Sequence, residues 1–92
     1  VDIDWEYPGR CGATCNFRPE DGENFTALLA EFREQLTQAE MDIETATGVR
    51  PDYLLTIAAP ASTYNAEPIE IGSIHDHLDW INLMTYDLYG AW

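Results

Sequence analysis

The sequence predicts an α/β fold whose strands lie parallel in one sheet. Three segments have the length and apolar content of strands, and they cover residues 1–7, 53–60 and 80–86. The intervals between them carry helical patterns. Strands that alternate with helices are joined by right-handed crossovers and therefore pair in parallel. Active sites in folds of this class gather at the C-terminal ends of the strands.

The first segment, residues 1–7, alternates acidic and apolar side chains. Successive side chains of a strand point to opposite faces, so Asp2, Asp4 and Glu6 share one face. Three carboxylates on one face repel each other and resist desolvation, so we expect them to take part in chemistry. The structural alternative is that they are merely solvated at the end of a strand. The opposite, apolar face is formed by Val1, Ile3, Trp5 and Tyr7.

A helix is expected to begin at residues 18–21, where a proline and two acids suit the first turn. Apolar residues then recur at helical spacing and form one stripe. They are Phe25, Leu28, Leu29, Phe32 and Leu36. We expect the helix to fray within residues 37–47, where β-branched and acidic residues interrupt the stripe, and to stop at Gly48.

Residues 53–60 form a continuous apolar run that ends at a proline, which is typical of a parallel strand buried on both faces. A short helix is expected around residues 68–78. Its apolar side is formed by Ile71, Ile74 and Leu78. The third strand, residues 80–86, ends at Asp87, at the sheet edge where Glu6 is also expected.

Cys11 and Cys15 lie close together in the loop after the first segment. They predict a small disulfide if the protein is secreted and two free thiols if it is cytosolic. A metal site would need further ligands at a suitable spacing, and His75 and His77 are far away in the sequence.

Composition limits the partners of the chain. Its 92 residues fit one domain, and the 17 acids against 4 basic residues give a formal charge of -13. This charge argues against nucleic acid and anionic membranes and suits a neutral partner such as a sugar polymer. The first residue already lies in a predicted strand, and Trp92 follows a turn without a finishing element. We therefore expect an internal piece of a larger domain.

The acids and a tyrosine suggest a shared chemistry. A like-charged neighbour such as Asp4 helps Glu6 to retain a proton near neutral pH, and a glycosidic oxygen needs such a proton as it leaves. The Tyr86 hydroxyl can donate to developing negative charge or orient an amide carbonyl. The structural alternatives are a rim aromatic at Tyr86 and core packing at Met84.

Residues 1–8 resemble the catalytic signature of glycoside hydrolase family 18, the chitinases, which reads Asp-x-x-Asp-x-Asp-x-Glu. The first Asp of that signature would lie two residues before Val1. Residues 81–92 are similar to the Met-x-Tyr-Asp segment on a later strand of the same family. Residues 18–21 and 54–60 also look like their counterparts, so the resemblance covers the whole chain.

The resemblance implies a (β/α)8 barrel, in which residues 1–92 would form strands four to six and the helices between them. They would be a partial catalytic domain, expected to be inactive when isolated. The family cleaves the β-1,4 links of N-acetylglucosamine polymers such as chitin with retention, and the resemblance implies no cofactor and no metal. It also implies an extracellular location.

The resemblance assigns a role to each candidate catalytic residue. Glu6 would protonate the leaving oxygen while the acetamido oxygen of the substrate attacks the anomeric carbon. Asp4 and Tyr86 would stabilise the resulting oxazolinium ion, and Asp2 would tune Asp4 from beneath.

Three further residues would bind substrate. Asp87 would contact sugar hydroxyls or the acetamido group, and Met84 would pack beside the acetamido methyl. Trp92 would stack on the product-side sugar or, as the structural alternative, hold a loop at the rim. By alternation with Glu6, Trp5 should instead face the helices.

Other functions remain open beside a chitinase. A non-catalytic chitin-binding lectin on the same barrel usually loses the acid that Glu6 supplies here. An endo-β-N-acetylglucosaminidase acting on N-glycans would share the acid and the tyrosine. A metal-dependent phosphohydrolase or glycosyltransferase would hold Mg²⁺ on paired aspartates, but it would need a Gly-rich loop or basic residues nearby, and the sequence offers neither.

Overall fold

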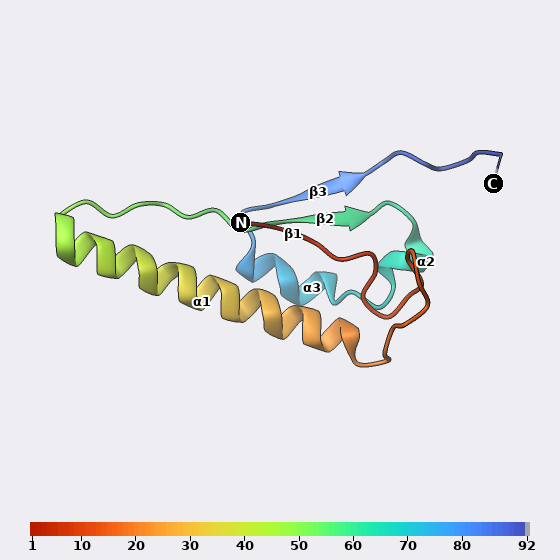
Figure 1. Ribbon diagram of the computed structural model, residues 1–92, viewed down its shortest axis with the longest axis horizontal. Coiled ribbons are helices and arrows are strands. Elements are labelled where there is room, and N and C mark those ends of the chain that lie inside the picture. Colours follow the sequence, from red (N-terminus) through yellow and green to blue (C-terminus); the bar gives the residue numbers. More distant parts are fainter. Residues whose placement is uncertain (92) are drawn as a thin grey trace.

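The computed structural model describes residues 1–91 and contains a parallel sheet of three strands (Figure 1). The strands are β1 (Asp2–Asp4), β2 (Thr56–Pro60) and β3 (Trp80–Met84). β2 is central and pairs with β1 on one side and with β3 on the other. The predicted α/β class with parallel strands is confirmed.

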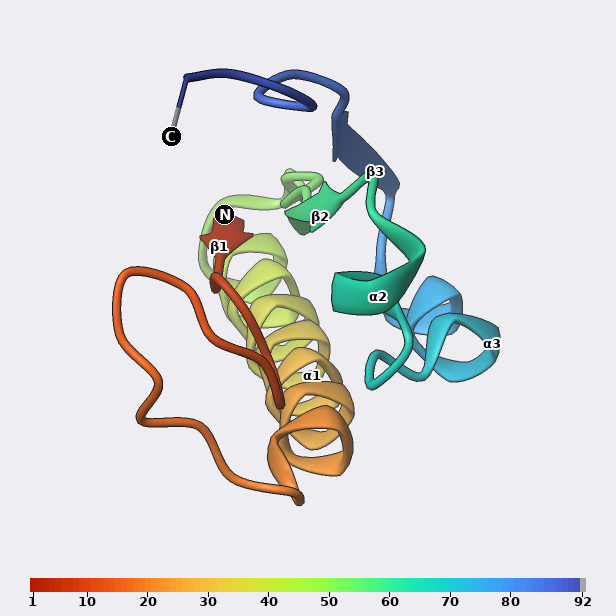
Figure 2. The same ribbon diagram turned by 90° about the vertical axis from the view of Figure 1, so that its right-hand side faces the viewer.

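Helices cover one face of this sheet. They are α1 (Asp21–Thr47) and α3 (Ile71–Ile74), which the 3₁₀ helix η1 (His75–His77) follows directly. The short helix α2 (Thr63–Ala66) lies beyond the C-terminal end of β2 (Figure 1). Figures 1 and 2 show α1 running beneath the sheet with α3 beside it. Across the described residues, no helix is both long enough and apolar enough to cross a membrane.

The core lies between the sheet and these helices. Its buried residues are Phe25, Leu29, Leu55, Ile57, Ala59, Ile69 and Ile74. The odd-numbered residues of β2 thus face the helices, and Ile3 and Trp5 of the first segment pack against the same cluster. The Trp5 and Phe25 rings meet edge to face, with centroids 5.6 Å apart. Each fully buried aliphatic or aromatic side chain stabilises the fold by about 1.5–3 kcal/mol.

The long helix α1 extends further than the sequence predicted. It continues without fraying to Thr47, where the sequence pattern is no longer apolar. The Thr45 and Thr47 hydroxyls donate to carbonyl oxygens one turn earlier, so these β-branched residues are accommodated within the helix. The expected stop at Gly48 is confirmed, because this residue has a φ of 78° and its N–H caps the Glu44 carbonyl.

The apolar stripe of α1 is narrower than predicted. Phe25 and Leu29 are buried, and Phe32 and Leu36 pack at the edge of the core. Leu28, which the sequence placed in the same stripe, is 39% exposed. Spacings of four, three and four residues keep the other four side chains on a single line that Leu28 flanks.

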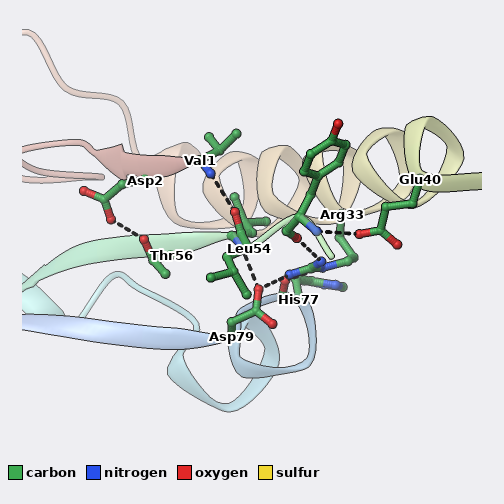
Figure 3. Close-up of polar contacts among 10 residues, drawn as sticks. Val1, Asp2, Arg33, Glu40, Leu54, Thr56, His77 and Asp79 are labelled. Carbon is green, nitrogen blue, oxygen red and sulfur yellow. Dashed lines mark hydrogen bonds and ion pairs between the residues drawn. The ribbon is translucent and has the colours of Figure 1, made fainter. Parts of the chain in front are cut away.

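All three strands are shorter than predicted. β1 ends at Asp4 and β3 at Met84, two or three residues early, and β2 begins at Thr56. Figure 3 shows the reason at the start of β2. The N–H of Tyr53 donates to Glu40 at 2.9 Å and the N–H of Leu55 to Asp79 at 2.7 Å, so side-chain carboxylates replace the partners that a neighbouring strand would supply.

These carboxylates belong to a polar network that ties the sheet to α1 (Figure 3). Arg33 donates to the carbonyls of His77 and Tyr53 at 2.9 and 3.2 Å and to Asp79 at 2.6 Å. The Leu55 N–H and then Arg33 hold the pKa of Asp79 below its ordinary value. Arg33 thereby links β2 and the start of β3 to the helix layer.

The second helical region differs from the single helix expected around residues 68–78. It divides into α3 and η1, and α2 precedes it where the sequence predicted none. Ile74 is buried and Leu78 packs against the core, as expected. Ile71, the first residue of α3, is 47% exposed and does not join the core as expected.

Candidate active site

A cavity of about 190 Å³ lies at the C-terminal end of the sheet. Glu6 and Tyr7 line it from the segment after β1, and Met84, Tyr86 and Asp87 line it from the end of β3. The end of β2, the link after it and α2 complete the wall, with Pro60, Ala61, Ser62 and Asn65. Four of the predicted site residues therefore meet in one cavity, at the sheet edge where parallel folds place their active sites.

The two aspartates of the acidic row lie on the sheet face that the helices leave open. Asp2 and Asp4 are exposed, whereas Ile3 between them is partly buried against the core. This confirms the alternation predicted for β1. Within the described residues, neither aspartate lines the cavity. Asp4 is two residues before Glu6, which does line it.

Asp2 belongs to a polar row that crosses all three strands. The Thr56 hydroxyl donates to the Asp2 carboxylate, as Figure 3 shows, and the Asn82 amide approaches the same oxygen at 3.5 Å. The Trp80 indole N–H donates in turn to Asn82 at 3.2 Å. Thr56 and Asn82 had no role assigned from the sequence. In the structure they fix the carboxylate of Asp2 on the open face.

Tyr7 is a site residue that the sequence reasoning missed. Alternation assigned it to the apolar face, but the strand ends at Asp4 and the chain bends at Glu6. Tyr7 consequently lines the cavity. Burial raises the pKa of Tyr7, and a hydrogen bond with Glu6 and the charges of Glu6 and Asp4 raise it further. Pro8 was the available signal, because a proline rarely continues a strand.

The C-terminal side of the cavity is more open. Tyr86 is 65% exposed, and Met84 is partly buried at the end of β3. Asp87 adopts a φ of 52°, in the left-handed region that aspartate tolerates better than most residues, and this turns the chain after the tyrosine. Trp92, the predicted stacking residue, lies outside the described residues.

The loop after Glu6 closes back on residues 5–9, the turn that carries Glu6 and is called the acid-bearing turn below. Cys11 and Cys15 form a disulfide, so the structure selects this alternative over free thiols or a metal site. Between them, Gly12 packs so tightly that an added Cβ would lie 1.8 Å from the Glu6 carbonyl oxygen. Within residues 1–91, no group of three or more His, Cys, Asp or Glu side chains is placed to hold a metal ion.

Arg10 fastens this loop to α2. Its guanidinium donates to the Tyr64 carbonyl at 3.1 Å, pairs with Glu67, and lies 4.6 Å from the centroid of the Tyr64 ring. It also donates to the carbonyl of Gly9 at 3.0 Å. The loop after β1 is therefore joined to α2, and both contribute residues to the cavity wall.

The cavity thus combines a carboxyl group with two phenol hydroxyls and a second carboxylate. This set can transfer a proton at one point and donate hydrogen bonds at another. The model of the glycosyl hydrolases family 18 matches residues 1–92 of the sequence. The chain belongs to this family.

Relatives in family 18 are similar over the full chain. Chitinase A1 of Niallia circulans is 47% identical and covers 100% of the chain, which spans 12% of the relative. The cell-surface-expressed chitinase ChiW of Paenibacillus sp. FPU-7 is 47% identical with a TM-score of 0.81, over 99% of this chain and 10% of that one. A family 18 N-acetylglucosaminidase of Paenibacillus barengoltzii is 39% identical with a TM-score of 0.82, over 100% and 25%.

Proposed function

We propose that residues 1–92 are part of the (β/α)8 catalytic domain of an enzyme that hydrolyses β-1,4-linked N-acetylglucosamine polymers such as chitin. In this proposal β1, β2 and β3 are strands four to six of the barrel. The convergence of Glu6, Tyr86 and Asp87 on one cavity carries the proposal. The parallel order of the strands and the names of the family 18 relatives support it.

Glu6 acts first as an acid and then as a base. Its carboxyl group protonates the glycosidic oxygen as the bond to the anomeric carbon breaks. The acetamido oxygen of the same sugar forms the new bond to that carbon and gives an oxazolinium ion. Glu6, now a carboxylate, takes a proton from the water that opens this ion. The anomeric configuration is retained because two displacements occur.

Asp4 and Tyr86 stabilise the cationic intermediate from two sides. The Asp4 carboxylate balances the charge that develops on the acetamido nitrogen, and the Tyr86 hydroxyl orients the acetamido oxygen. Asp2, held by Thr56 and Asn82, adds negative charge beside Asp4. Tyr7 lines the cavity beside Glu6 and presents a second hydroxyl there.

The remaining cavity residues bind the sugar. Asp87 accepts hydrogen bonds from sugar hydroxyls or from the acetamido N–H, and Met84 packs against the acetamido methyl. Trp92 stacks on the product-side sugar. The substrate is a neutral polymer, in keeping with the formal charge of -13, and the chemistry needs no cofactor. An extracellular location agrees with the Cys11–Cys15 disulfide.

The test uses the complete catalytic domain that carries this chain and an N-acetylglucosamine oligomer, with the product anomer followed by NMR. We expect the β-anomer to appear first and a cello-oligosaccharide of equal length to remain intact, because cellulose has no acetamido group. An initial α-anomer, or hydrolysis of both oligomers, would refute the mechanism. Binding without turnover would indicate a lectin instead.

A further inference from the structure

Asp21 is a buried carboxylate that the proposed mechanism does not use. It is the first residue of α1 and only 6% exposed. One of its oxygens accepts two backbone hydrogen bonds, from the N–H of Arg18 at 2.9 Å and from the N–H of Gly9 at 3.3 Å. The first bond is local to the helix start. The second reaches back across 12 residues to the turn that carries Glu6.

The Gly9 end of this contact belongs to the acid-bearing turn. Gly9 is buried and follows the buried Pro8. Its φ is 70°, a backbone conformation that residues other than glycine rarely adopt. Only two residues, Tyr7 and Pro8, separate Gly9 from Glu6. A hydrogen bond that holds Gly9 in this conformation therefore also fixes where the chain leaves the cavity.

Close packing is a second constraint on the contact between the start of α1 and the acid-bearing turn. Pro68 lies against Gly9, where an added Cβ would be 3.0 Å from its ring. Pro68 also lies against Gly22, the neighbour of Asp21, where an added Cβ would be 2.1 Å from the Pro68 carbonyl oxygen. The first turn of α1 and the acid-bearing turn thus both pack against Pro68. This contact leaves little room for either turn to shift.

We infer that Asp21 is a positioning residue for Glu6, and this inference rests on the proposed function. Asp21 acts through the Gly9 N–H: its oxygen anchors the acid-bearing turn to the start of α1, so that the Glu6 carboxyl group meets the glycosidic oxygen. The role needs an oxygen acceptor at the length of an aspartate side chain. It does not need the negative charge.

The test compares variants of the complete catalytic domain with a soluble N-acetylglucosamine oligomer as substrate. Asp21→Ala should lower kcat by roughly tenfold or more while KM changes little, because misplacing a catalytic group by a fraction of an ångström has such an effect. Asp21→Asn retains an acceptor oxygen and should stay within roughly threefold of wild type. Glu23→Ala removes an exposed acid from the same helical turn and is the matched control.

Further outcomes separate the explanations. Wild-type kcat in Asp21→Ala, or a fall in Glu23→Ala of the same size, would overturn the inference. If Asp21→Ala does not fold, Asp21→Glu replaces it: the longer acid should lose activity although it keeps the charge, and wild-type activity there would overturn the inference. Activity in Glu6→Gln would instead refute the proposed function, so the two failures are distinguishable.

Discussion

The two sides of the candidate site are built differently. The acid-bearing turn and its loop, residues 5–12, are fixed by Asp21, by the close approach of Gly12, and by Arg10. The segment after β3, residues 85–91, carries side chains that are largely exposed. Tyr86 there is 65% exposed.

The difference separates two ways of placing a functional group. Contacts around Glu6 restrict the backbone, so substitutions of residues that never touch substrate should change activity on that side. Within residues 1–91, the segment that carries Tyr86 is exposed, so the prediction for that side of the site concerns the Tyr86 hydroxyl itself.

Tyr86→Phe should lower kcat by about 100-fold, the usual effect of removing one donor that stabilises developing charge. KM should change little, since the phenyl ring still fills the same volume. The measurement is steady-state hydrolysis of an N-acetylglucosamine oligomer by the complete domain. Tyr89→Phe removes a hydroxyl from the same segment but from a side chain that does not line the cavity among the described residues, so it is the matched control and should behave as wild type. Equal losses in both variants would contradict the role given to Tyr86.

Gly12→Ala should lower kcat by roughly tenfold without any change in the chemical groups of the cavity. The new methyl group would overlap the Glu6 carbonyl oxygen, so the acid-bearing turn must shift. Gly72→Ala is the control, because nothing lies within 4 Å of an added Cβ at that position. If Gly12→Ala retained full activity, the loop would have no part in positioning Glu6.

The smallest effect concerns stability and lies away from the site. The Tyr53 N–H and then Arg50 hold the pKa of Glu40 below its ordinary value of 4.5. The folded state therefore binds this proton less readily than the unfolded chain, and the stabilisation is present above pH 4.5 and lost as pH falls through the lowered value.

Urea unfolding at several pH values checks this expectation. Glu40→Gln should be less stable than wild type at pH 7, and the difference should shrink in acid. Glu44→Gln is the control, since Glu44 is half-exposed and lies 3.7 Å from the same arginine. A stability difference that stays constant below pH 4.5 would contradict the assignment.

Hydrophobic periodicity predicted the order and type of the main elements because burial decides them. The odd-numbered residues of β2 and the line of Phe25 and Leu29 on α1 form the core that the pattern indicates. The ends of the elements were predicted less well, because side-chain hydrogen bonds decide them. The Tyr53 N–H bonds to Glu40, which lies 13 residues away, and no local pattern announces that contact.

The candidate site shows the same division. The acidic alternation and the tyrosine near the end of the chain predicted Glu6 and Tyr86, and both line the cavity. Tyr7 was assigned to the wrong face because the alternation was extended beyond the end of β1. The sequence indicated for Asp21 only the usual preference for an acid in the first turn of a helix. Its contact with Gly9 forms only when α1 packs beneath the sheet, so the sequence could not predict it.

The most direct test of the account is hydrolysis and binding by the complete catalytic domain with Glu6→Gln. The amide has the shape of the acid but cannot supply the proton. We predict that turnover of an N-acetylglucosamine oligomer falls by at least about 100-fold, the range for a general acid, while the oligomer still binds with near wild-type affinity. Turnover within a few-fold of wild type would contradict the role of Glu6 and with it the proposed mechanism.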